Sequence, residues 1–153
     1  MSYTPFSMIF LAGGIGARMG TSIPKQYVKI CQKPLALYSF EVLIALSEVQ
    51  DFIVVCDPAY NALFQDTAKS RKLSLRFALP GRRRQDSVFN AAQLLQDDPL
   101  VCLHDAVRPL IEETMIRRVV ETADHWEAAA LGVKARSTIR ICDGAQVVVA
   151  TPD

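Results

Sequence analysis

The sequence predicts a Rossmann-like α/β fold, with an open, mainly parallel sheet and helices on both faces. Short apolar runs alternate with segments of helical character as far as Val133, as in a series of β-α-β units. The run Phe52-Ile53-Val54-Val55 is continuously apolar, which is typical of a strand that is buried on both faces. A glycine-rich loop follows the first run, at the edge where such sheets bind ligands.

In the first half of the chain, the apolar run Met8-Ile9-Phe10-Leu11 predicts a strand over 7–11. Pro34 favours the first turn of a helix, and apolar residues at 37, 40, 43 and 44 share one helical face, which predicts a helix over 35–46. The second strand is expected over 51–56. A helix over 58–72 follows it.

The second half repeats this alternation. A strand is expected over 73–79, followed by a helix over 87–96 with Asp86 as its candidate N-cap. A strand over 100–104 precedes a helix over 112–126, whose first turn is acidic, as the helix dipole favours. A fifth strand is expected over 128–133.

The last segment differs from the rest of the single domain expected over 1–153. Asp143-Gly144 lies between two β-rich runs and predicts a hairpin over about 137–150 with a type I′ turn. A two-stranded hairpin is at best marginally stable alone, so a second copy of the chain is one candidate partner. The chain stops soon after this hairpin without a closing element, so we expect the C-terminal part of the domain to be missing.

Composition excludes several classes of protein. Half of the 153 residues are apolar and the net charge is +1, so neither disorder nor nucleic-acid binding is expected. No window approaches the ~18 apolar residues of a membrane span, and the N-terminus lacks a signal-like run, so a cytoplasmic protein is expected. Four widely separated cysteines without a Cys-x-x-Cys pair favour buried, reduced thiols over zinc or disulfides.

The glycine loop (residues 12–20) predicts a polyphosphate site. Its glycines allow close approach of backbone N–H groups to an anion, and Arg18 and Lys25 add two cations. No Lys-Ser/Thr pair follows Gly20, which excludes a Walker loop, and the third glycine is one residue late for a dinucleotide fingerprint. Pro24 also disfavours a helix running on from Gly16.

Two further segments are expected at the same edge, Pro80–Ser87 and His104–Pro109, and each has a structural alternative. The three arginines 82–84 form either a solvated turn or a site with at least one functional member. Ser87 is most simply a residue of the helix start, and Asp105 and Arg108 are either a local ion pair or bind substrate or metal. His104 is expected to be structural rather than a catalytic base.

Together these motifs resemble the 2-C-methyl-D-erythritol 4-phosphate cytidylyltransferase family. The matching stretches are Leu11 through Gly20, Pro24-Lys25-Gln26-Tyr27, Gly81 through Val88, and His104-Asp105-Ala106-Val107-Arg108-Pro109. The resemblance implies transfer of CMP from CTP to methylerythritol phosphate with Mg²⁺, giving CDP-methylerythritol and pyrophosphate, in non-mevalonate isoprenoid biosynthesis. It also implies that the hairpin is a protruding arm that clasps a partner in a homodimer.

The resemblance implies a role for each matching residue. Arg18 and Lys25 would be catalytic, and Asp105 would be the candidate metal ligand. The acceptor polyol phosphate would be bound by Asp105, Arg108 and Thr138. The nucleotide would be bound by Leu11, Ala12, Gly13, Gly14, Gly16, Gly81 and Ser87.

Two departures from the family pattern keep alternatives open. The family more often has two alanines where this chain has Ala12-Gly13, and Ser137 stands where the family has Asp. A ribitol-5-phosphate cytidylyltransferase therefore remains a rival, although Tyr27 and Ser87 favour methylerythritol phosphate. A non-catalytic nucleotide-binding module is a second alternative, and a dehydrogenase is disfavoured by the glycine spacing.

Overall fold

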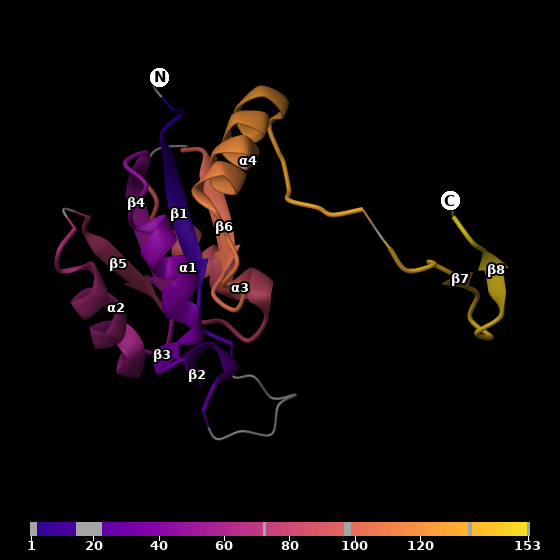
Figure 1. Cartoon of the computed structure of the whole chain (residues 1–153), viewed down its shortest axis with the longest axis horizontal. Helices are drawn as coiled ribbons and strands as arrows, with labels where there is room; N and C mark the ends of the chain where they lie inside the picture. Colours follow the sequence, from indigo (N-terminus) through magenta and orange to yellow (C-terminus); the bar gives the residue numbers. More distant parts are fainter. Residues whose placement is uncertain (1–2, 15–22, 72, 97–98, 135, 153) are drawn as a thin grey trace.

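A four-stranded parallel sheet forms the centre of the computed structural model, which describes residues 3–14, 23–71, 73–96, 99–134 and 136–152. The strand order is β5-β4-β1-β6 (Figure 1). The strands are β1 (Phe6–Leu11), β4 (Val49–Val55), β5 (Leu75–Ala78) and β6 (Val101–Asp105). The predicted parallel α/β sheet is therefore confirmed.

Helices cover both faces of this sheet. They are α1 (Leu35–Leu43), α2 (Asn61–Ala68), α3 (Arg84–Ala92) and α4 (Glu113–Trp126). Buried residues of α1, α2 and α4 share the larger apolar core, whereas Ala91 of α3 belongs to the smaller core on the opposite face. In the described part of the chain, none of the helices has the length and apolar character that crossing a membrane requires.

Strand β1 alternates its side chains between these two cores. Met8 and Phe10 face the larger core and Ile9 faces the smaller one, and all three are at most 1% exposed. Phe10 packs against Phe40 and other phenylalanine rings, with centroids 5.6 Å apart for this pair. Burial on both faces explains why the strands lack a polar side in the sequence.

Several predicted elements have different bounds. Helix α3 begins at Arg84, and Asp86 lies in its first turn, where its carboxylate accepts the Arg83 backbone N–H at 3.0 Å. The prediction that Asp86 is the N-cap is thus wrong, because the carboxylate caps the helix from inside the first turn. The helix expected over 58–72 divides into the 3₁₀ helix η3 (Pro58–Tyr60) and α2.

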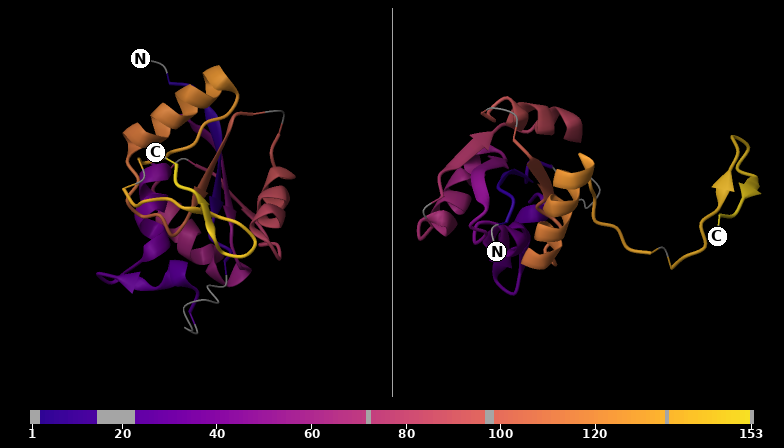
Figure 2. Two further views of the ribbon diagram at one scale, coloured as in Figure 1. Left: turned by 90° about the vertical axis from the view of Figure 1, so that its right-hand side faces the viewer. Right: turned by 90° about the horizontal axis from the view of Figure 1, so that it is seen from above.

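The fifth strand expected over 128–133 is wrong. These residues have no strand assignment, and all are exposed except Ala129, which is half-buried. They lie in an extended segment that leaves the sheet after α4 (Figures 1 and 2). A strand needs a hydrogen-bonding neighbour, and this segment runs away from the edge strand β6 rather than along it.

The predicted hairpin is present as β7 (Ile141–Cys142) and β8 (Val148–Ala150), which pair antiparallel. Its turn is not type I′, because the left-handed residue is Gln146, with φ 64°, and not Asp143. The Gln146 N–H donates to the Asp143 carbonyl at 3.0 Å, and the Asp143 carboxylate accepts two further backbone N–H groups. This side-chain bonding favours a longer loop with one left-handed residue.

A second hairpin was not predicted from the sequence. Strands β2 (Lys29–Ile30) and β3 (Lys33–Pro34) pair through Cys31 and Gln32, whose φ angles are 48° and 65°. Neither residue is a usual choice for a left-handed position, so the sequence carried no turn signal there.

The four cysteines are all free, and of these Cys56 and Cys102 are buried. Burial raises the pKa of Cys102 to about 11, so this thiol stays protonated. Cys31 and Cys142 lie on the two hairpins and are exposed. The expectation of buried thiols is therefore correct for the sheet cysteines and wrong for the hairpin cysteines.

Candidate functional site

The chain changes direction across the sheet at β1, which has β4 on one side and β6 on the other. A crevice at the carboxyl ends of the strands is expected at such a switch point. The Ala12 N–H donates to the Val55 carbonyl at 2.8 Å, and the Ala106 N–H donates to the Leu11 carbonyl at 3.0 Å. Parallel pairing therefore brings the segments after β1, β5 and β6 to one edge of the sheet.

Residues 12–14 of the glycine loop are held by hydrogen bonds from side chains of the 3₁₀ helix η2 (Lys25–Tyr27). The Gln26 carboxamide donates to the carbonyls of Ala12 and Gly14, both at 2.7 Å, and the Tyr27 hydroxyl donates to Ala12 at 2.9 Å. Burial raises the pKa of Tyr27 above its ordinary value, so the hydroxyl keeps the proton that it donates. Gln26 was not predicted to have a role, although it lies beside Lys25 in the Pro24–Tyr27 motif.

Gly13 joins the loop after β1 to the loop after β5. A Cβ atom at Gly13 would lie 2.4 Å from the Cβ of Pro80, closer than real side chains approach. At Gly14 a Cβ would meet nothing within 4 Å. Only the first of these two glycines is therefore required by close packing.

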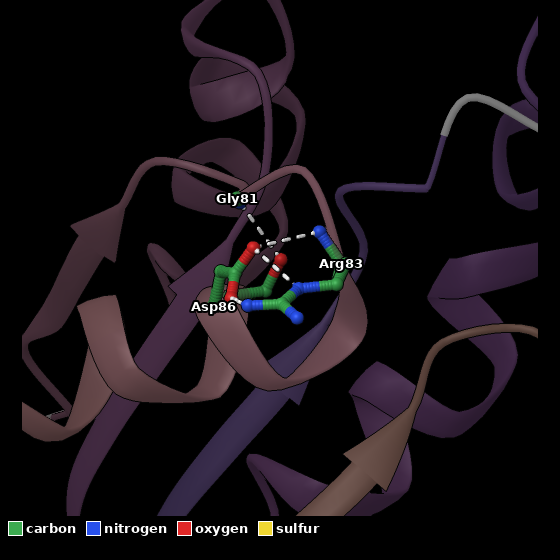
Figure 3. A network of polar contacts seen from close by, with 4 residues as sticks. Gly81, Arg83 and Asp86 are labelled. Atoms are coloured by element: carbon green, nitrogen blue, oxygen red, sulfur yellow. Dashed lines mark hydrogen bonds and ion pairs between the residues drawn. The ribbon is translucent and has the colours of Figure 1, made fainter.

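Gly81 lies beside Arg83 and Asp86 at the start of α3 (Figure 3), and its backbone is in direct contact with Ser87. The Gly81 N–H donates to the Ser87 hydroxyl at 2.9 Å, and a Cβ at Gly81 would lie 2.3 Å from that of Asp86. Ser87 lies within α3 rather than at its N-cap. Because a hydroxyl that accepts one hydrogen bond still has a proton to donate, Ser87 retains the capacity to bind a ligand acceptor.

Asp105, at the end of β6, lies between two guanidinium groups. Arg84 of α3 donates to one carboxylate oxygen from Nε at 3.2 Å and from Nη2 at 3.0 Å. Nε of Arg108 lies 3.3 Å from the other oxygen. A local ion pair, one of the two alternatives for Asp105 and Arg108, is present, and Arg84 joins it. No local pattern singles out Arg84 within the run of three arginines.

The metal-binding capacity of this edge is limited. Among the residues that the structure describes, no group of three or more His, Cys, Asp or Glu side chains is arranged to hold a metal ion. Mg²⁺ is usually held by one or two carboxylates together with substrate phosphates and water. Asp105 fits such a minimal role beside a triphosphate, but these residues do not form an all-protein metal cage.

The buried position of His104 supports the structural role expected for it. Its side chain is buried, its ring is stacked on Phe10 with centroids 5.8 Å apart, and Nε2 lies 3.2 Å from the Arg108 carbonyl. Burial lowers the pKa of His104 below its ordinary value, which favours the neutral ring. The histidine thus supports the backbone that presents Arg108.

The remaining predicted site residues differ in whether they lie near this edge of the sheet. Gly16 and Arg18 lie outside the described residues. Lys25 is exposed on η2, next to Gln26 and Tyr27, the two residues that hold the glycine loop and are called the clamp below. The segment between α4 and β7, which includes Thr138, leaves the sheet (Figure 1), so a single chain does not bring Thr138 to this edge.

Comparison with known proteins identifies similar sequences over nearly the whole chain. The family model described as 2-C-methyl-D-erythritol 4-phosphate cytidylyltransferase matches residues 6–153. A chloroplastic protein of that name from Oryza sativa subsp. japonica is 43% identical over 148 residues, which is 96% of this chain and 50% of the relative. One from Chlamydia pneumoniae is 41% identical over 143 residues, which is 90% of this chain and 64% of the relative. The chain thus spans about half to two thirds of the length of these relatives.

Solved structures show the same fold. A 4-diphosphocytidyl-2C-methyl-D-erythritol synthase from Anaerococcus prevotii superposes with a TM-score of 0.77 at 18% identity, covering 98% of this chain and 65% of the other. A bifunctional protein from Campylobacter jejuni superposes with a TM-score of 0.62 at 25% identity, covering 80% of this chain and 31% of the other.

Proposed function

Because the chain belongs to the 2-C-methyl-D-erythritol 4-phosphate cytidylyltransferase family, we propose that it transfers CMP from CTP to 2-C-methyl-D-erythritol 4-phosphate. The products are CDP-methylerythritol and pyrophosphate, in non-mevalonate isoprenoid biosynthesis. One observation carries this proposal. The glycine loop, the contacting residues Gly81 and Ser87, and Asp105 all lie at the same switch point of the sheet. A switch point is where open α/β sheets bind nucleotides.

The nucleotide is bound by the loops after β1 and β5. Leu11 through Gly14, with Gly16, approach the ribose and triphosphate, where backbone N–H groups act as anion ligands. Gly81 and Ser87 read the cytosine. This assignment is supported by the Gly81–Ser87 hydrogen bond, because base recognition needs donors and acceptors in fixed positions.

Transfer forms a bond between the acceptor phosphate oxygen and the α-phosphorus of CTP, and breaks the bond to pyrophosphate. The attacking oxygen is already an anion, so no general base is required. Lys25 and Arg18 stabilise the charge on the α-phosphate as it passes through a five-coordinate state. Asp105 would hold Mg²⁺ together with the substrate phosphates, and the ion would supply further neutralisation of the triphosphate.

In the proposed homodimer the acceptor is bound by Asp105 and Arg108 of one copy and by Thr138 from the arm of the other, since a single chain does not bring Thr138 to this edge. The Asp105 carboxylate is fixed by Arg84 and Arg108, which prepares it to accept hydrogen bonds from acceptor hydroxyls. The Arg108 side chain is 74% exposed and is therefore available to an anionic phosphate as well.

The hairpin arm supports a homodimer. Five apolar side chains on and beside the hairpin are about half exposed: Ile139, Ile141, Val147, Val148 and Val149. An isolated hairpin with such a surface gains stability by packing on another copy of the chain. Light scattering after size exclusion should show a dimer, converted to monomer by Val148→Lys but not by Leu110→Lys, which changes an equally apolar residue outside the hairpin.

The four free cysteines support a reducing compartment such as the cytoplasm. Two of these thiols are exposed, and exposed thiols tend to be oxidised in secreted proteins. Thiol titration of the protein purified without reductant should find all four cysteines free.

The deciding experiment is pyrophosphate release by the full chain with CTP and each of two acceptors. We expect release with methylerythritol phosphate. Preference for ribitol phosphate under the same conditions would reassign the acceptor, and CTP binding without turnover would favour the non-catalytic module.

A further inference from the structure

We propose that Gln26 and Tyr27 are positioning residues that set the shape of the glycine loop for a nucleoside triphosphate. The inference rests on the proposed function and adds two residues to its site. Neither side chain reaches the surface, since Gln26 is 2% and Tyr27 is 7% exposed. Both therefore act through the loop that they hold.

A single carboxamide holds two carbonyl groups of the loop. Nε2 of Gln26 donates both of its protons, one to the Ala12 carbonyl and one to the Gly14 carbonyl, each at 2.7 Å. The Tyr27 hydroxyl gives the Ala12 carbonyl a second donor at 2.9 Å. Three hydrogen bonds thus fix two carbonyl groups within three residues.

Fixing these carbonyls also fixes where a backbone N–H points. In a trans peptide the C=O and the following N–H lie on opposite sides of the chain. Because the Ala12 carbonyl points toward Gln26 and Tyr27, the Gly13 N–H points away from them. A phosphate-binding loop needs its N–H groups aimed at the ligand before the ligand arrives, which this clamp achieves without touching the ligand.

The core holds the clamp in place from two elements. The Tyr27 ring is stacked on Tyr60 of η3, with centroids 3.5 Å apart and planes inclined by 8°. Its edge also meets Phe64 of α2 at a centroid distance of 6.4 Å. Lys25 belongs to the same 3₁₀ turn as Gln26 and Tyr27, so one turn positions both the loop and the exposed ammonium group.

The experiment compares matched hydroxyl deletions in the full chain. Tyr27→Phe removes the bond to the glycine loop and leaves the ring stack intact. Tyr38→Phe is the control, because its hydroxyl also donates to a backbone carbonyl, that of Ile30, at 2.6 Å and away from the loop. Gln26→Glu tests the carboxamide, since a carboxylate has no proton to donate to either carbonyl.

Calorimetry with CTP should show a dissociation constant raised about 5-fold by Tyr27→Phe and about 10-fold or more by Gln26→Glu, with Tyr38→Phe unchanged. Thermal midpoints of the two tyrosine variants should agree, and amide exchange over residues 12–14 should be faster in Tyr27→Phe alone. In turnover assays, Tyr27→Phe should raise KM for CTP more than it lowers kcat, as expected of a residue that preorganises binding.

Equal CTP affinity in Tyr27→Phe and Tyr38→Phe would overturn the inference. A full chain that binds no CTP would instead overturn the proposed function. In that case amide exchange still decides whether the clamp shapes the loop, because it requires no nucleotide. If Gln26→Glu fails to fold, Tyr27→Phe alone carries the test.

Discussion

Gly13 and Pro80 meet so closely that a methyl group at Gly13 would lie 2.4 Å from the Pro80 Cβ. This contact joins the loops after β1 and β5, which the proposed function assigns to the phosphates and the base of one nucleotide. In this chain the opposing proline has taken the space that an alanine needs.

We predict that Gly13→Ala lowers the free energy of unfolding by about 1–3 kcal/mol, because the added methyl group overpacks a rigid contact. Adding Pro80→Gly should restore most of the loss, since it removes the opposing Cβ. Urea unfolding of both variants measures this coupling. Gly14→Ala is the control, where a Cβ meets nothing and stability should not fall. Additive effects of the two changes would contradict the contact.

We predict that Lys25→Ala lowers kcat by ~10²-fold or more, with a smaller change in KM for CTP, because the ammonium group acts on charge that develops in the transition state. Steady-state pyrophosphate release provides both constants. Lys29→Ala is the control, since Lys29 is also exposed and lies on the nearby hairpin. A change confined to KM would show that Lys25 binds ground-state phosphate only.

We predict that Asp105→Asn lowers kcat/KM for the acceptor by ~10²-fold, because the carboxylate between Arg84 and Arg108 loses its charge. Binding of CTP, followed by calorimetry, should change much less. Asp51→Asn is the matched control, as Asp51 also forms an ion pair, with Arg76, but away from the carboxyl ends of the strands. Similar losses in both variants would indicate a stability effect instead.

We predict that the free energy of unfolding falls as pH decreases below 6.5. Burial lowers the pKa of His104 below its ordinary value of 6.5, so the unfolded chain takes up a proton that the folded chain refuses. The stability is therefore full above pH 6.5 and is lost as pH falls toward the folded pKa.

Urea unfolding between about pH 8 and about pH 5 tests this pH dependence. The window lies above the range in which Glu48 contributes, because its pKa is held below 4.5 by the Arg117 hydrogen bond. His104→Gln should flatten the profile in this window, and an unchanged slope would assign the effect to another group.

The succession of strands and helices along the chain was largely predictable, because local patterns report burial directly. The runs around Phe10 and Phe52 are apolar on both faces, and strands of this kind occur between two helical layers. The run at 128–133 has similar apolar character but forms no strand. Its outcome depends on a neighbouring strand, which no local pattern specifies.

The candidate site was predictable in part for the same reason. Glycines and charges after strand ends predict a ligand-binding edge, and Gly81, Ser87 and Asp105 lie near one another at the carboxyl ends of the strands. The partners Gln26 and Arg84 were not assigned, since their roles depend on hydrogen bonds to Ala12 and Asp105 across loops.

The sequence by itself determined the parallel sheet, the helices on its two faces and the edge where the glycine loop lies, because each depends on the chemistry of neighbouring residues. Only the tertiary structure decided that Gly13 must be glycine, that Arg84 holds Asp105, and that Gln26 and Tyr27 hold the loop. These contacts join residues that are distant along the chain, and their geometry is set by parallel strand pairing and packing of the core.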